Sequence, residues 1–189
     1  KKTKYMKKSY LIIGGIILVI IIAVGSYAST YNKAVGLQEE VNNEWGDVQS
    51  AYQRRADLVP QLVATVKGAA ENEKEILIKV TQARSGIINA KSPQDMELLG
   101  KEINTAINLA FERYPQIKST ENFAALQAQL EGTENRINVA RDRFSDSAKK
   151  FNKKIKKIPG RLFNALAGFE EKGYFKSDKG AEKAPELFK

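Results

Sequence analysis

Residues 9–32 read SYLIIGGIILVIIIAVGSYASTYN, and this stretch carries no charge. Of the 14 residues from Leu11 to Val24, 11 are Leu, Ile or Val. Eleven such side chains favour membrane insertion by roughly 3–6 kcal/mol, and about 20 apolar helical residues cross a hydrocarbon core of ~30 Å. Tyr10 and Tyr27 lie near the two ends, where tyrosine favours the lipid headgroups. The sequence therefore predicts a transmembrane helix over residues 9–31.

The same segment has a second interpretation, a cleaved signal peptide. Lys7 and Lys8 would then form its charged start, and Ala23–Val24–Gly25 would be a small-residue cleavage site. We expect the uncleaved anchor, whereas a mature chain that begins near Ser26 would support the signal peptide.

Positive charge lies mostly on one side of this segment and predicts its orientation. Only Lys33 follows it closely, whereas five lysines precede it: Lys1, Lys2, Lys4, Lys7 and Lys8. Because basic residues tend to remain on the cytoplasmic side, we expect a single-pass membrane protein with a cytoplasmic N-terminus and the rest of the chain outside.

Beyond the anchor, apolar residues recur at the three- and four-residue spacing of helices that face a core. Caps, glycines and prolines mark four helices: Gly68 ends the first, Asn72 begins the second, Ser92–Pro93 begins the third, Pro115 follows it, Thr120 begins the fourth and Pro159–Gly160 ends it. Pro60 lies inside the first helix, where we expect a kink or a short break because proline removes a backbone donor.

Short connections make successive helices antiparallel. The predicted fold class is therefore all-α, with an N-terminal transmembrane helix followed by an elongated antiparallel up-and-down four-helix bundle. We divide the chain into a basic segment over residues 1–8, the transmembrane helix over 9–31, the bundle over 32–160, and a short helix with a tail over 161–189. Four passes would return the end of the fourth helix to the bilayer surface.

The chain contains neither cysteine nor histidine. This excludes disulfides and thiolate metal sites, and it removes the commonest metal ligand and the commonest general base. The net charge of +9 is concentrated at the two ends, since residues 30–144 carry 14 basic and 16 acidic side chains. We therefore expect a non-enzymatic protein with no catalytic residues, cofactor, metal or nucleic-acid partner.

A basic cluster near the end of the fourth helix suggests contact with lipid. Its members are Lys149, Lys150, Lys153, Lys154, Lys156, Lys157 and Arg161. The apolar residues Leu162, Phe163, Leu166 and Phe169 follow directly. We predict that lysines meet lipid headgroups while the apolar segment, beginning with Leu162 and Phe163, lies in the interface. The alternative is a solvated helix face and a short helix that caps the bundle.

Charged and polar residues interrupt the middle of the first and fourth helices. They are Arg54, Arg55, Asp57, Glu131, Glu134, Asn135 and Arg136. In an antiparallel pair of similar length these positions face each other, and buried charges need partners. We interpret them as a structural polar network that fixes helix register; a ligand-binding cluster is the alternative.

Several stretches resemble the LemA family. They include QRRADLVPQLV at Gln53–Val63, LEGTENRINVAR at Leu130–Arg141 and GAEKAPELF at Gly180–Phe188, in order and over about residues 30–189. Gln61 and Ala51–Tyr52 depart from the residues usual in the family. The resemblance implies a bacterial membrane-anchored four-helix bundle without established enzymatic activity or cofactor.

These observations favour a scaffold at the bacterial cell-membrane surface. Its expected partners are the lipid bilayer and further copies of the same chain in a homo-oligomer, because long amphipathic helices beside an anchor suit lateral packing. Two alternatives remain: a sensory or ligand-binding extracytoplasmic domain, and an accessory subunit that docks a membrane protease or transporter.

Overall fold

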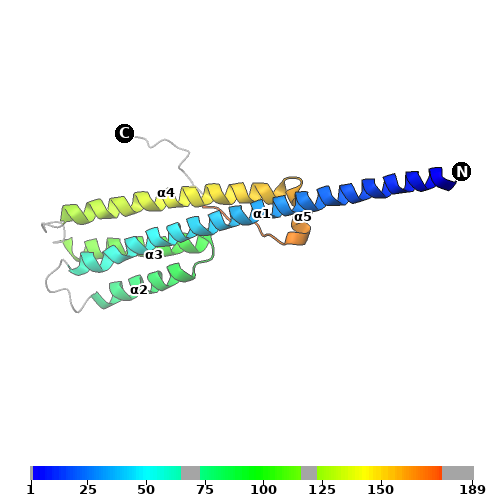
Figure 1. Cartoon of the computed structure of the whole chain (residues 1–189). Coiled ribbons are helices and arrows are strands. Elements are labelled where there is room, and N and C mark those ends of the chain that lie inside the picture. Colours follow the sequence, from blue (N-terminus) through cyan, green and yellow to red (C-terminus); the bar gives the residue numbers. More distant parts are fainter. Residues whose placement is uncertain (1, 65–72, 116–122, 176–189) are drawn as a thin grey trace, which may run out of the picture. The chain divides into compact units, whose positions relative to one another are not determined.

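The structure is a computed structural model that describes residues 2–64, 73–115 and 123–175. The described residues form five helices and no strands: α1 (Lys2–Ala64), α2 (Glu73–Asn89), α3 (Pro93–Arg113), α4 (Phe123–Lys156) and α5 (Gly160–Ala167) (Figure 1). The expected all-α class and the long apolar N-terminal helix are confirmed. The chain divides into two compact units, which we treat separately. The first unit is Lys1–Glu40 with Lys149–Lys172, and the second is Val41–Ala148 with Gly173–Lys189.

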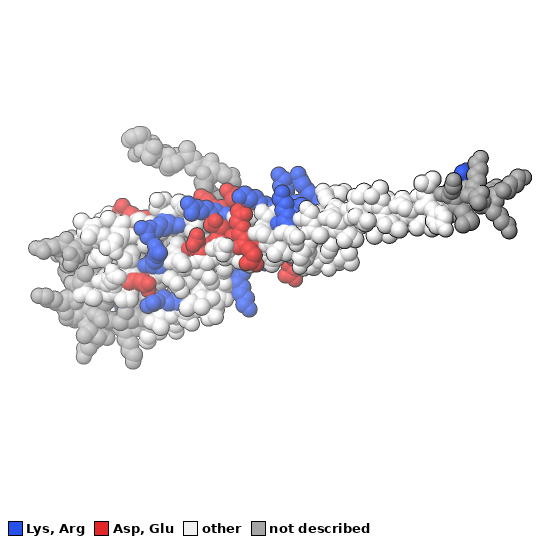
Figure 2. Space-filling view, viewed as in Figure 1, with Lys and Arg blue, Asp and Glu red and all other residues white. Residues whose placement is uncertain are grey.

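α1 is one uninterrupted helix that contains both the apolar segment and the first helix expected beyond it. It passes through Pro60 without the short break that we considered. The eleven Leu, Ile and Val residues from Leu11 to Val24 are each at least 52% exposed, and Figure 2 shows this stretch as an uncharged surface. α1 is long and apolar enough to cross a membrane by length and composition. A contiguous apolar surface of this kind is compatible with a membrane anchor.

The core of the second unit takes an apolar stripe from each of its four helices. The largest fully buried side chains of this unit are Val41, Val48, Val59, Leu62, Val80, Ile87, Met96 and Ile103, and α4 adds Leu126, Leu130, Ile137 and Phe144. Burial of each such side chain contributes about 1.5–3 kcal/mol. Ile88 of α2, although apolar, is 66% exposed. Its neighbour Ile87 takes the core position, because successive helical residues point about 100° apart.

Contacts inside the second unit run in the antiparallel sense. Trp45 of α1 packs 5.0 Å from Phe144 of α4, whereas Arg55, later in α1, contacts Leu130, earlier in α4. Position along α4 therefore falls as position along α1 rises. α3 pairs with α4 in the same sense, since Glu97 contacts Arg141 and Phe111 packs 6.1 Å from Phe123.

The start of α3 is set by the cap that the sequence predicts. The Ser92 hydroxyl accepts a hydrogen bond from the Asp95 N–H at 3.2 Å, and the Asp95 carboxylate accepts one from the Ser92 N–H at 3.1 Å. The hydrogen bond with the Ser92 side chain, together with bonds from the N–H groups of Lys91 and Ser92, holds the pKa of the Asp95 carboxyl below its usual range. α3 ends at Arg113, before Pro115, as expected. The predicted boundaries at Gly68, Asn72 and Thr120 lie outside the described residues.

Candidate membrane-interface site

In the first unit, α5 and the end of α4 pack against α1 just beyond its apolar segment. We call residues 149–169 the collar. The Phe163 ring meets Tyr27 edge-on at 5.3 Å, and Phe169 lies 5.6 Å from Tyr31. Phe169 also meets the fully buried Phe151 of α4 edge-on at 5.8 Å. The collar is therefore fixed by aromatic rings at the level of Tyr27, which the sequence places at the end of the uncharged stretch.

Two glycines and two asparagines shape the collar. A Cβ at Gly160 would overlap the Lys154 carbonyl oxygen, so glycine permits the close return of the chain into α5. Gly168 ends α5 in the left-handed region, with φ 69°. The Asn164 side chain donates to the Phe169 carbonyl and accepts from its N–H at 3.0 and 2.9 Å. The buried Asn152 makes the same two bonds with the backbone of Lys172, at 2.8 and 2.9 Å.

α5 has apolar residues on two sides that lie about 100° apart. Phe163 and Ala167 are half-buried, and Phe163 packs on α1. Leu162 and Leu166, four residues apart on the other face, are 66% and 80% exposed. Ile158, also apolar, lies in the turn before α5 and is 78% exposed. The predicted pair Leu162 and Phe163 therefore divides, with Leu162 pointing outward and Phe163 packing inward.

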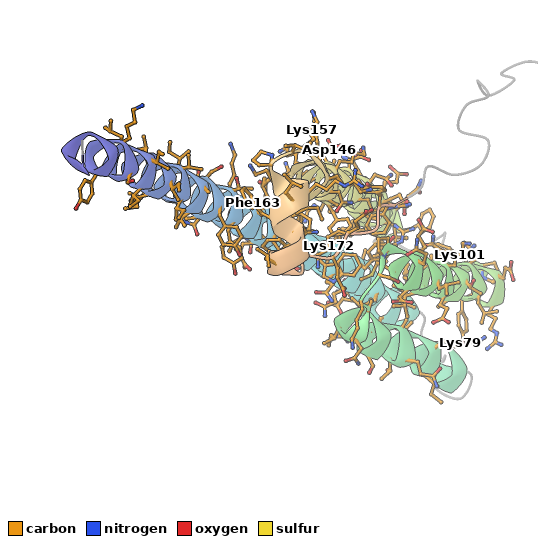
Figure 3. The ribbon with its side chains drawn as sticks, turned by 90° about the vertical axis from the view of Figure 1, so that its right-hand side faces the viewer. Lys79, Lys101, Asp146, Lys157, Phe163 and Lys172 are labelled. Atoms are coloured by element: carbon orange, nitrogen blue, oxygen red, sulfur yellow. The ribbon has the colours of Figure 1, made fainter. Side chains whose placement is uncertain are left out.

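The basic cluster directly precedes this exposed apolar face along the chain. Six of the predicted cations are exposed and Lys154 is half-buried. Lys150 pairs with Glu40 at 3.2 Å, and Lys156 pairs with Glu171 at 2.7 Å. Four of the lysines border one groove of about 350 Å³ with Leu37 and Ile158: Lys150, Lys153, Lys154 and Lys157. Lys157 lies at the turn that precedes α5 (Figure 3). The collar thus combines a positive surface with an apolar one.

The mid-helix polar residues in the second unit fall into separate groups. Arg55 is 13% exposed at its side chain and pairs with Glu134 at 3.0 Å. It also donates to the Leu130 carbonyl at 3.0 Å and to Asn104 of α3 at 2.9 Å. Asp57 pairs with Arg84 of α2 at 3.0 Å. Glu131 accepts a hydrogen bond from Gln127 within α4 at 3.1 Å.

We call Arg55, its partners and the residues beside them the Arg55 layer. Its members outside the predicted polar network include Tyr52, Glu97, Gly100 and Arg141. Arg141 pairs with Glu97 at 3.2 Å and stands over the Phe175 ring at 4.8 Å. Tyr52 packs against Gly100, where an added Cβ would come within 2.6 Å of its ring. Burial raises the pKa of the Tyr52 phenol, while Arg141 opposes the rise, so the phenol is neutral at physiological pH. Gly100 inside the apolar stripe of α3 was the one sequence signal of this close approach.

Arg54, Asn135 and Arg136 lie on a different face of the second unit from Arg55. With Arg143 they border a groove of about 380 Å³ between α1 and α4, which we call the arginine groove. Its lining consists of Asp47, Ser50, Ala51, Arg54, Asn135, Arg136, Val139, Ala140 and Arg143. Within the described part of the chain, none of the three arginines forms an ion pair or hydrogen bond. No group of three or more metal-ligating side chains occurs among the described residues.

Comparison with known proteins identifies the family. The family model described as LemA family matches residues 44–187. Protein LemA of Metamycoplasma hominis is 27% identical over 147 residues, which is 74% of this chain and 67% of that protein. The match includes the whole collar and the whole arginine groove. The resemblance that the sequence motifs indicate is thus confirmed, and the chain belongs to the LemA family.

Proposed function

We propose that this protein is a non-enzymatic scaffold of the bacterial cell membrane, anchored by residues 9–31 of α1 and braced on the lipid surface by the collar. In this proposal the N-terminus is cytoplasmic and the helices beyond the anchor lie outside. The observation that carries the proposal is the position of α5, which packs on Tyr27 and leaves its leucines uncovered in the described structure.

The two-sided character of α5 supports a lipid contact. A helix that only capped the bundle would need one apolar face, which Phe163 and Ala167 already provide. Leu162 and Leu166 would remain in water at a cost, whereas burial in the interface stabilises each by about 1.5–3 kcal/mol. A lysine near an anionic surface contributes about 1 kcal/mol. A few uncovered apolar side chains and exposed lysines therefore give the collar a firm but reversible hold on lipid.

The cysteine-free chain allows a direct test of this contact. A fluorophore on Leu166→Cys of the full-length protein in lipid nanodiscs should be quenched by nitroxides attached at shallow acyl positions. The same label on Gln94→Cys, an exposed position of α3, is the matched control and should not respond. If the two labels respond alike, the collar does not lie in the interface.

The proposed orientation needs an experiment in cells. A membrane-impermeant maleimide should label Asn108→Cys, which is exposed on α3, in intact spheroplasts. Thr3→Cys should react only after the membrane is permeabilised. The reverse pattern would place the helices beyond the anchor in the cytoplasm, and the collar would then meet the inner leaflet.

The scaffold role requires more than one copy in the same membrane. An anchor and a surface-bound collar would restrict the long helices to lateral encounters, which raises their effective concentration. Mass photometry of the protein in nanodiscs should therefore show homo-oligomers. A clean monomer at all tested protein-to-lipid ratios would argue against self-association.

One observation supports the alternative of a sensory or ligand-binding role. A cleft of about 190 Å³ lies in the Arg55 layer and is lined in part by Tyr52, Arg55, Asn104, Glu134 and Arg141. Charged groups of both signs around a phenol would suit a small zwitterion. A thermal shift with amino acids that is lost in Tyr52→Phe would favour this role over the scaffold.

A further inference from the structure

We propose that the arginine groove binds an acidic amphipathic helix of a partner protein. This inference is independent of the lipid contact, because the groove lies in the second unit and the collar in the first. It would give the accessory-subunit alternative a physical docking surface.

Charge is the first argument. Arg55 and Arg141 on the same two helices point into the protein and pair with Glu134 and Glu97. The groove arginines Arg54, Arg136 and Arg143 are exposed and have no such partner in the described residues. Of the described residues that line the groove, Asp47 alone carries a carboxylate. Three guanidinium forks around one concave surface favour a partner that brings several carboxylates.

Shape is the second argument. Each helix contributes residues spaced over two turns, from Asp47 to Arg54 on α1 and from Arg136 to Arg143 on α4. Because a helix rises 1.5 Å per residue, the seven residues between these ends span about 10.5 Å. The floor between these ends is made of small or short side chains: Ser50, Ala51, Val139 and Ala140. Val139 is 43% exposed although it is apolar. Small residues between two helices let a third helix approach to about 8–10 Å.

The occupant follows from combining these two features. A helix with a small or apolar stripe would fill the floor, and its carboxylates at a spacing of about seven residues would meet the arginines on both sides. A second copy in a two-fold symmetric contact would oppose the same arginines to one another, which like-charge repulsion disfavours. Single-stranded nucleic acid would lack a stacking surface, since no aromatic residue lines the groove among those that the structure describes.

The test uses full-length protein in nanodiscs of a zwitterionic lipid, so that the membrane offers no competing charge. The probe is a synthetic amphipathic helix with an alanine and leucine stripe flanked by glutamates at seven-residue spacing. A shuffled peptide of identical composition is its control. Fluorescence anisotropy should show that the patterned peptide binds about tenfold or more tightly than the shuffled one, because only the patterned helix aligns its carboxylates with the groove.

Matched variants separate the groove from general positive charge. Arg54→Gln, Arg136→Gln and Arg143→Gln together should weaken binding about tenfold to a hundredfold, as three partly exposed ion pairs are lost. Lys153→Gln, Lys156→Gln and Lys157→Gln in the collar remove the same charge and should leave binding unchanged. Fluorescence of Trp45, the single tryptophan, verifies that each variant is folded.

A disulfide crosslink then locates the peptide. Ser50→Cys on the groove floor should crosslink to a cysteine in the peptide stripe, and Asn108→Cys on α3 should not. Equal binding of the shuffled peptide, equal loss in the lysine variant, or equal crosslinking at the two cysteines would each overturn the proposal. Displacement by single-stranded DNA as effective, per charge, as displacement by peptide would also overturn it in favour of a general polyanion surface.

Discussion

α1 meets its neighbours through different chemistry in the two units. In the collar the contact is made of rings, with Tyr27 against Phe163 and Tyr31 against Phe169. In the second unit a layer of charged and amide groups around Arg55 connects α1 with α3 and α4. The Arg55 layer finds partners within the chain, whereas the collar leaves Leu162 and Leu166 uncovered in the described structure.

This difference separates two uses of side-chain chemistry. Aromatic contacts stabilise strongly but discriminate weakly among partners, because dispersion and apolar burial have little directionality. Hydrogen bonds from a guanidinium require particular acceptors at particular positions, so the Arg55 layer is suited to defining which helices meet and in what register. A helix that aromatic rings hold in place on one face can present its other face to lipid, and we interpret α5 of the collar in this way.

The largest effect should come from removing the collar's buried ring. Phe151→Ala truncates a fully buried side chain that contacts Phe169, and we expect a loss of about 3–5 kcal/mol in the free energy of unfolding. Urea unfolding of the full chain in micelles, followed by far-UV circular dichroism, measures it. Leu162→Ala, on the exposed face, should change stability by less than ~0.5 kcal/mol. Similar losses for both variants would mean that Leu162 is packed as tightly as Phe151.

Neighbouring arginines offer the next test. Arg55→Met keeps much of the apolar stem but removes bonds to Glu134, Asn104 and the Leu130 carbonyl, and should cost about 2 kcal/mol. Arg54→Met removes an exposed guanidinium and should cost less than ~0.5 kcal/mol. Trp45 packs in one cluster with Phe144 and Phe175, so its fluorescence reports unfolding of the second unit. Equal costs would contradict the assignment of Arg55 to the interior and Arg54 to the surface.

Alanine substitutions at two glycines compare an enclosed position with an open one, and we expect smaller changes in stability from them. An alanine Cβ at Gly100 would lie 2.6 Å from the Tyr52 ring, which is itself buried. We expect Gly100→Ala to cost about 1 kcal/mol net, since overpacking outweighs the gain in helix propensity. Gly46→Ala meets nothing within 4 Å and should stabilise α1 by about 0.5–1 kcal/mol. Opposite signs in thermal unfolding are the expected result; a stabilised Gly100→Ala would show that Tyr52 moves freely.

The smallest effect concerns the α3 cap and depends on pH. The pKa of the Asp95 carboxyl is lowered in the folded state, so its ionised form stabilises folding above the ordinary aspartate pKa of about 3.9. That contribution should disappear as the pH falls through the lowered folded-state value. The native chain should therefore be more stable than Asp95→Asn near neutral pH, and the two should converge in acid. A difference that persists below the folded-state pKa would assign the cap's contribution to something other than the carboxylate.

Much of this fold can be predicted from the sequence because its signals are local. The start of α3 at Ser92–Pro93 depends on residues within one turn, and the apolar segment depends only on composition and length. The collar's short helix is also predictable, since Pro159 precedes it and apolar residues recur within it. The partners of the charged residues are harder to predict from the sequence. Asp57 contacts Arg84 of α2 rather than a residue of α4, and no local spacing connects those two positions.

The sequence by itself determined the uncharged segment of the N-terminal helix, the all-α class and the family, because each rests on composition, periodicity or motifs along the chain. Only the tertiary structure decided that Arg54 borders an open groove while Arg55 is enclosed, and that Leu162 faces outward while Phe163 packs inward. The physical reason is rotational: adjacent residues of a helix point about 100° apart. Which of those directions is interior depends on the helices that come to lie beside it.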